Sequence, residues 1–216
     1  LAGQSRNPGG LCWSGVAGAH RLARGGVSLY THRMSTAPRY QPHYTVADYC
    51  QWSGDWELWN GMAVAMSPSP LGPHERAVAK LVFQVESCLQ RDSCPCASYA
   101  GLDWIVQDDT VVRPDVMIVC GKQPGRYLEQ SPALVIEVLS PATADKDRSA
   151  KRSLYELAGV GHYLLVDPVA KTIEWLSLGE KGRYDDRSAE TAADELFSVT
   201  VNDGCRIEFD RRLTFA

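Results

Sequence analysis

Two apolar runs of this chain each carry a carboxylate where a buried strand is expected. The run VVRPDVMIVC (111–120) contains Asp115, and the run ALVIEVLS (133–140) contains Glu137. A buried carboxylate is strongly destabilising unless a partner compensates its charge. Because a single loop, GKQPGRYLEQSP, joins the two runs, we expect neighbouring strands that direct both carboxylates toward a shared partner. A metal ion is one candidate for that partner.

The two carboxylates have a second possible explanation. In each run, the residues that alternate with the carboxylate are apolar, so both acids lie on faces expected to be buried. Backbone N–H groups or arginine side chains could hold such a pair without any metal. Arg113 and Arg148 are the nearest candidates in the sequence.

Apolar periodicity and turn residues divide the chain after residue 44 into helices and strands. Asn60-Gly61 is a strong hairpin signal because both positions of the turn need positive φ. The order of elements predicts an α/β fold in which helices flank a mixed β-sheet. The expected elements are a short helix at 45–52 capped by Thr45, a hairpin at 56–66, a helix at 74–90, strands at 97–107, 111–120 and 133–139, a helix at 141–159, strands at 162–167 and 172–178, and edge strands beyond them.

The helix at 141–159 directs a lysine toward the expected sheet. Asp147 and Lys151 could form an ion pair four residues apart while the lysine stem lies along the surface. Alternatively, the ammonium reaches the two carboxylates. Two acids and a lysine around a metal suit phosphodiester hydrolysis, because the ion neutralises charge on phosphorus and the lysine positions or activates the attacking water. At about 100° per residue, the buried arc comprises Ala150, Leu154, Leu157 and Ala158, with Asp147, Lys151 and Tyr155 on the same half.

Composition and charge limit the class of protein. The apolar share of 44% and the charged share of 22% are ordinary for a globular chain, and 216 residues fit one domain. No apolar run approaches the roughly 20 residues of a membrane helix, so no membrane association is expected. Residues 1–33 contain four arginines and no acid, and the rest has 18 basic and 26 acidic residues, a net charge of −8. Nucleic-acid binding would therefore need a local basic patch or bound cations.

The N-terminal segment differs from the rest of the chain. Residues 1–33 contain seven glycines and show no apolar periodicity. We interpret them as an N-terminal extension, non-native or flexible, and residues 34–216 as a single domain. A transit peptide is the alternative, since such peptides are rich in arginine and poor in acids.

The cysteines indicate a reducing environment. Their number, seven, is odd, and no CxxC pair occurs, which favours free thiols and a cytoplasmic location. Cys94 and Cys96 could join Cys88 in a zinc site, but no second pair of ligands follows.

Several motifs together resemble a known family. The segments ELWNGMAVAMSPSPLGPHERAVAKL, RPDVMIV, EVLSPAT, DRSAKRSLY and GVGHYLLVDP occur in this order between Tyr40 and Leu178. As a set they resemble the Uma family of bacterial restriction endonucleases, members of the PD-(D/E)xK nuclease superfamily. The resemblance implies a restriction-endonuclease-like core, a DNA substrate and a homodimer.

The resemblance also implies a metal site. Asp115 matches the aspartate of the PD motif and Glu137 the (D/E) position, and with the backbone carbonyl of Val138 they would hold Mg²⁺ or Mn²⁺. The lysine expected two residues after Glu137 is missing, because Leu139 occupies that position. In this family the lysine is displaced onto the following helix, where Lys151 would orient the attacking water.

Other residues match family positions around this site. Glu57 would be a further catalytic acid that binds metal or holds water. His74 would contact phosphate or metal, although a histidine at a helix start is more often structural. Basic residues at the mouth of the site would bind DNA: Lys146, Arg148, Arg152 and Arg113.

Three functions are compatible with these residues. The first, which the resemblance favours, is metal-dependent endonucleolytic hydrolysis of DNA phosphodiester bonds. The second is a catalytically inactive nuclease-fold protein with a binding or interaction role, which the missing lysine after Glu137 and the acidic body favour. The third is metal-dependent hydrolysis of another phosphate ester.

Overall fold

The computed structural model describes residues 42–66, 72–191, 194–201 and 204–216, so the expected extension at 1–33 lies outside the described residues. The helices are α1 (Val46–Tyr49), α2 (Gly72–Arg91), α3 (Ala144–Lys146), the π-helical turn η1 (Asp147–Lys151), α4 (Arg152–Leu157), α5 (Ser188–Thr191) and α6 (Arg211–Thr214). The strands are β1 (Trp56–Trp59), β2 (Met62–Ala65), β3 (Cys96–Ala100), β4 (Trp104–Gln107), β5 (Thr110–Val112), β6 (Val116–Cys120), β7 (Leu134–Val138), β8 (His162–Asp167), β9 (Thr172–Leu178), β10 (Tyr184–Asp186), β11 (Leu196–Thr200) and β12 (Arg206–Asp210).

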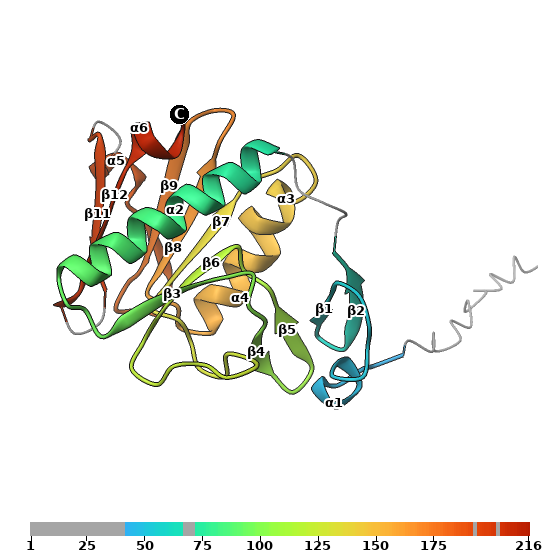
Figure 1. The fold of residues 1–216 in the computed structure, drawn as a ribbon. Coiled ribbons are helices and arrows are strands. Elements are labelled where there is room, and N and C mark those ends of the chain that lie inside the picture. Colours follow the sequence, from blue (N-terminus) through green and yellow to red (C-terminus); the bar gives the residue numbers. More distant parts are fainter. Residues whose placement is uncertain (1–41, 67–71, 192–193, 202–203) are drawn as a thin grey trace, which may run out of the picture. The chain divides into compact units, whose positions relative to one another are not determined.

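A six-stranded mixed sheet in the order β10-β9-β8-β7-β6-β3 forms the centre of the fold (Figure 1). Only the β7–β8 pair is parallel among its strand pairs, and the α3–η1–α4 helix makes the crossover between these two strands. Helix α2 and the hairpin β11–β12 pack on one face of the sheet. The α3–η1–α4 helix packs on the other. The predicted mixed sheet flanked by helices is confirmed.

Successive side chains of β6 and β7 point alternately into two cores, one on each face of the central sheet. Ile118 and Ile136 face the core beneath α2. Met117 and Val135 face the second core, which contains Tyr155 of α4. Side chains two residues apart share a face, so Glu137 points with Val135 toward the α3–η1–α4 helix.

Helix α2 follows the expected amphipathic pattern. Its buried side chains, which include Leu81, Val85 and Leu89, recur at helical spacing and face the sheet. Within the part of the chain that the structure describes, no helix is both long enough and apolar enough to cross a membrane.

A smaller sheet, in the order β2-β1-β5-β4, carries the predicted hairpin. Asn60 and Gly61 both have positive φ, 45° and 78°, as a two-residue hairpin turn requires. The expected single strand at 111–120 is wrong: β5 belongs to this sheet and β6 to the central one. Pro114 lies between them, and its fixed φ and missing N–H favour a break in a ladder. Asp115 therefore lies in the connection directly before β6 rather than inside a strand.

The predicted buried arc of the 141–159 helix is wrong in part. Ala150 is exposed and Leu157 is 84% exposed, whereas Asp147, Lys151 and Tyr155 are buried. The reason is η1, because a turn closed by i→i+5 bonds is wider than an α-helical turn. A helical projection at about 100° per residue therefore misplaces residues from η1 onward. Asp147, Lys151 and Tyr155 occupy the face against the sheet.

The prediction of free thiols is wrong for four cysteines. Disulfide bonds join Cys94 to Cys205 and Cys96 to Cys120, so the suggested zinc site with Cys88 does not form. The β3–β6 register places Cys96 directly opposite Cys120, a relation that spacing in the sequence does not contain. Cys50 and Cys88 are free, and Cys12 lies outside the described residues.

The hairpin turn gives a test of this architecture. A Cβ atom at Gly61 would lie 2.1 Å from the His43 ring, and φ there is positive. We expect Gly61→Ala to lower the free energy of unfolding by about 1–2 kcal/mol, the cost of the left-handed conformation for a residue with a Cβ. Gly125→Ala is the matched control, since no atom lies within 4 Å of the position that its methyl group would take, and its stability should stay within about 0.5 kcal/mol. Urea denaturation measures both, and equal stabilities would contradict the turn geometry.

Candidate active site

The segments that carry the predicted site residues enclose a cavity of about 240 Å³. Its walls come from the hairpin β1–β2, the start of α2, the β5–β6 connection, β7 and the α3–η1–α4 helix. Residues far apart in the sequence therefore meet in one place. The lining residues are Glu57, Val64, Ala65, Met66, His74, Arg113, Asp115, Glu137, Ala142, Thr143, Lys146, Asp147 and Lys151.

Asp115 is fixed through one of its two carboxylate oxygens. Its Oδ2 accepts a hydrogen bond from the backbone N–H of Val138 at 2.7 Å and lies 3.2 Å from Nε2 of His74. Its side chain is 25% exposed. Among the described residues, none donates a hydrogen bond to Oδ1. That oxygen is available to a ligand in the cavity.

Glu137 is buried on β7 and is also held through one oxygen. Its Oε1 accepts hydrogen bonds from Nζ of Lys151 at 2.7 Å and from the hydroxyl of Tyr155 at 2.6 Å. Its Oε2 faces the backbone N–H of Asp115 at 3.4 Å, a long contact. The two donors fix the carboxylate while Oε2 remains turned toward Asp115.

The wide turn η1 places Lys151 among several acids. Beyond its bond to Glu137, its Nζ lies 3.5 Å from Oδ1 of Asp147 and 4.0 Å from Oε1 of Glu57. The ammonium thus contacts Glu137 on β7 and also pairs with Asp147, four residues earlier in the same helix. The hydroxyl of Tyr163 on β8 donates to the backbone carbonyl of Asp147 at 3.0 Å, which ties η1 to the sheet.

Asp147 is a site residue that the sequence predicted only as an ion-pair partner. It is 2% exposed and lines the cavity, and its Oδ1 accepts no hydrogen bond from any described residue. Burial raises its pKa. The signals in the sequence were its position four residues before Lys151 and its place on the buried half of the helical projection.

Glu57 differs from the other acids because both of its oxygens are occupied. Oε1 accepts from the backbone N–H of Arg113 at 3.0 Å, and Oε2 accepts from the indole N–H of Trp59 at 3.0 Å and pairs with Lys146. The Lys146 ammonium also lies 5.1 Å from the centroid of the Trp59 ring. Glu57 thus connects the hairpin to the α3–η1–α4 helix, and this geometry fits a positioning residue better than a metal ligand.

The cavity brings four carboxylates together with the ammonium groups of Lys146 and Lys151, the guanidinium of Arg113 and the imidazole of His74. Burial raises the pKa of Glu137 to about 8, and Lys151 offsets only part of this effect. Burial lowers the pKa of Lys151, but the surrounding carboxylates outweigh burial and raise that pKa, so the ammonium stays charged. Burial raises the pKa of Asp115, but the hydrogen bond and charge of His74 outweigh it and leave the pKa below its ordinary value.

Two of the predicted DNA-binding residues lie elsewhere. Arg148 is half-exposed and pairs with Glu174 at 2.6 Å, and neither Arg148 nor Arg152 lines the cavity. Arg113 does line it, but its guanidinium pairs with Asp103 at 2.6 Å. Neither Arg113 nor Arg148 holds the two strand carboxylates through its side chain. The arginine part of the non-metal alternative is therefore wrong, whereas its backbone part is present, since the N–H of Val138 donates to Asp115 and the N–H of Asp115 faces Glu137.

The donor set fits a hard divalent cation at one position. Oδ1 of Asp115 accepts no hydrogen bond from a described residue, and Oε2 of Glu137 accepts only the long one from the backbone N–H of Asp115, in the same cavity. Across the described ranges, no three His, Cys, Asp or Glu side chains are grouped as ligands of one ion. Mg²⁺ is commonly held by one or two carboxylates and keeps several waters. Two carboxylates with the backbone carbonyl of Val138 are sufficient for such an ion.

Comparison with known proteins defines first a class and then a family. A solved structure described as "a putative nuclease belonging to DUF820", from Anabaena variabilis, matches with a TM-score of 0.63 and 14% identity, over 80% of this chain and 97% of that chain. The two proteins thus share a fold. The family model Uma2, described as "Putative restriction endonuclease", matches residues 46–208, and the chain belongs to this family. No curated protein matches the chain.

The buried lysine gives a test of the site's electrostatics. Lys151→Met should lower the free energy of unfolding by about 3–5 kcal/mol, because it leaves buried carboxylates without their cation. Adding Glu137→Gln to that variant should restore part of the loss, since one uncompensated charge disappears. Lys181→Met, at an exposed position, is the control and should change stability by less than about 0.5 kcal/mol. Chemical denaturation of the three variants makes the comparison, and an unchanged Lys151→Met protein would show that the ammonium is not buried among acids.

Proposed function

We propose that this chain is a metal-dependent endonuclease that hydrolyses phosphodiester bonds of DNA. The observation that carries the proposal is the contact between Nζ of Lys151 and Oε1 of Glu137, 2.7 Å, beside Asp115 in one cavity. The chain lacks a lysine two residues after Glu137, yet an ammonium reaches the same carboxylate from the α3–η1–α4 helix. Membership of the Uma2 family supports the nuclease class.

Each residue has a separate part in the proposed reaction. Asp115, Glu137 and the carbonyl of Val138 would hold Mg²⁺ or Mn²⁺. When bound, the ion supplies Lewis acidity that neutralises charge on the phosphate and favours ionisation of water. Lys151 would orient the attacking water from the side of the helix.

His74 and Glu57 would act around this centre. His74 lies 3.2 Å from Oδ2 of Asp115, and although burial lowers the pKa of this imidazole, its carboxylate neighbours outweigh burial and raise that pKa. A protonated His74 would donate to Asp115 or to a substrate phosphate. Glu57, with both oxygens engaged, would keep Lys146 and the hairpin in place. Dimer formation, as the family resemblance implies, would bring two such sites to one duplex.

Metal binding is the first test. Isothermal titration calorimetry of the parent protein should detect Mn²⁺ or Mg²⁺ binding, and Asp115→Asn should abolish it because an amide does not supply the charge. Asp115 is partly exposed, so this isosteric variant should keep the fold, which circular dichroism checks. Asp103→Asn, which changes a carboxylate outside the cavity, should bind the ion like the parent. Equal binding by parent and Asp115→Asn would refute the metal assignment.

Cleavage is the second test, by single-turnover reaction with plasmid or oligonucleotide DNA in Mn²⁺. Lys151→Ala should lose several decades of rate while DNA binding weakens modestly, because the lysine acts on the transition state. Lys151→Arg should not restore the rate, since a planar guanidinium does not replace a compact ammonium at close range. Arg152→Ala, exposed on the same helix, should spare the rate and change only salt-dependent binding. A parent protein that binds DNA but does not cleave it with any divalent metal would support the inactive, binding function instead.

A further inference from the structure

Half-buried aromatic rings line a second hollow on the face of the hairpin opposite the candidate active site. Glu57 points into the active-site cavity, whereas its neighbour Trp56 lines this other hollow, as alternation along β1 requires. Tyr44 and Trp52 complete its aromatic wall, and the cavity measures about 400 Å³. We call it the aromatic groove.

The rings of the aromatic groove are held at steep angles to one another. The centroids of Tyr44 and Trp52 lie 5.2 Å apart with an interplanar angle of 86°, and those of Trp52 and Trp56 lie 6.0 Å apart at 66°. The indole N–H of Trp56 donates to the carbonyl of Ser53 at 3.0 Å, which fixes the ring. Rings packed edge to face form a corner, and a flat ligand can stack on one wall of a corner and contact the other.

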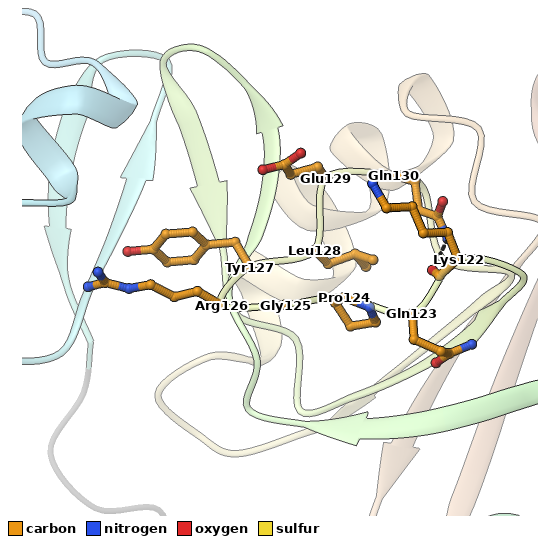
Figure 2. Close-up of a pocket in the computed structure, with 9 residues that line it drawn as sticks. All are labelled: Lys122, Gln123, Pro124, Gly125, Arg126, Tyr127, Leu128, Glu129 and Gln130. Carbon is orange, nitrogen blue, oxygen red and sulfur yellow. Dashed lines mark hydrogen bonds between the residues drawn. The ribbon is translucent and has the colours of Figure 1, made fainter.

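A smaller cavity of about 180 Å³ has lining residues in common with both the aromatic groove and the active-site cavity. It shares Trp52 and Trp56 with the groove and Arg113 with the active-site cavity. Arg126 and Tyr127 of the loop 122–130 also line it, and their side chains extend side by side (Figure 2). Shared lining residues thus relate the cavity that contains Asp115 to the rings of the aromatic groove.

The charged side chains that line the smaller cavity favour a phosphate beside Arg126. Arg113 is compensated by Asp103 at 2.6 Å and Asp55 at 2.8 Å. Arg126 lies over the ring of Tyr127, 5.1 Å from its centroid, and no carboxylate of a described residue lies within ion-pair distance of it. The aromatic groove itself offers neutral rings. This alternation of an unpaired cation with stacking surfaces matches a nucleotide strand better than a peptide or an aliphatic chain.

We propose that the aromatic groove binds an unpaired nucleobase of the DNA strand whose phosphodiester lies in the candidate active site, with Arg126 beside the adjoining phosphate. The proposal rests on the nuclease function proposed above, which supplies the strand. It identifies the substrate as DNA with a single-stranded flank, a mismatch end or a base displaced from the duplex. Trp52 is the residue whose loss should matter most, because its ring packs against both Tyr44 and Trp56.

The test is fluorescence anisotropy in EDTA, where no cleavage interferes, with three labelled DNAs. These are a blunt hairpin duplex, the same duplex with a six-thymidine flank, and six thymidines alone. The parent should bind the flanked duplex at least about fivefold more tightly than the blunt one. That ratio corresponds to the lower end of the binding free energy that one stacked base contributes. Trp52→Leu should lose this preference, Trp52→Phe should keep most of it, and Phe83→Leu, an aromatic residue 72% exposed on α2, should leave it unchanged.

Each other outcome has a definite meaning. Equal affinity of the parent for blunt and flanked duplexes, or an intact preference in a folded Trp52→Leu protein, overturns the groove proposal and leaves the cleavage test untouched. Binding of none of the three DNAs also overturns it. A Trp52-dependent flank preference without cleavage in any metal upholds the groove and refutes the nuclease function. A concentration-dependent dimer that Trp52→Leu abolishes, with no flank preference, would identify a second copy as the occupant.

Discussion

The candidate active site depends on one buried ammonium among carboxylates. Nζ of Lys151 contacts Glu137 on the central sheet, Asp147 on its own helix and, at 4.0 Å, Glu57 on the hairpin. Each of these acids is almost fully buried. A single cation thereby compensates charges from three parts of the chain. The relative position of sheet, helix and hairpin at the cavity is coupled to this one side chain.

The hairpin is tied to this centre by a second connection. Glu57 accepts the backbone N–H of Arg113 and pairs with Lys146, so it joins the hairpin both to the β5–β6 connection and to the helix. Trp56, the residue before it, points to the other face and forms part of the aromatic groove. Alternation along one short strand therefore links the geometry of the active site to that of the proposed nucleobase site. A displacement of the hairpin would alter both.

The sequence predicted those parts of the structure that depend on local chemistry. Asn60-Gly61 predicted its hairpin because the turn requires positive φ at both residues. The apolar patterns around Asp115 and Glu137 predicted adjacent strands, and the structure brings these two residues together. The disulfide partners were not predictable, because the pairing of Cys96 with Cys120 follows from the register between two strands and not from their spacing. Asp147 was underestimated for a similar reason, since its burial depends on how the helix meets the sheet.

The displaced lysine changes what the fold requires of its helix. With Leu139 at the position two residues after Glu137, that strand site serves the apolar core, where Leu139 packs with Val135 and Leu165. The ammonium must then come from the helix, whose face against the sheet holds polar and apolar side chains together. With the wide turn η1 in this helix, Lys151 and Tyr155 both contact Oε1 of Glu137, while Leu157 is left in solvent. A π-helical turn is tolerated where the site benefits from it, and here the benefit is a fixed ammonium beside the carboxylates without a lysine in the sheet.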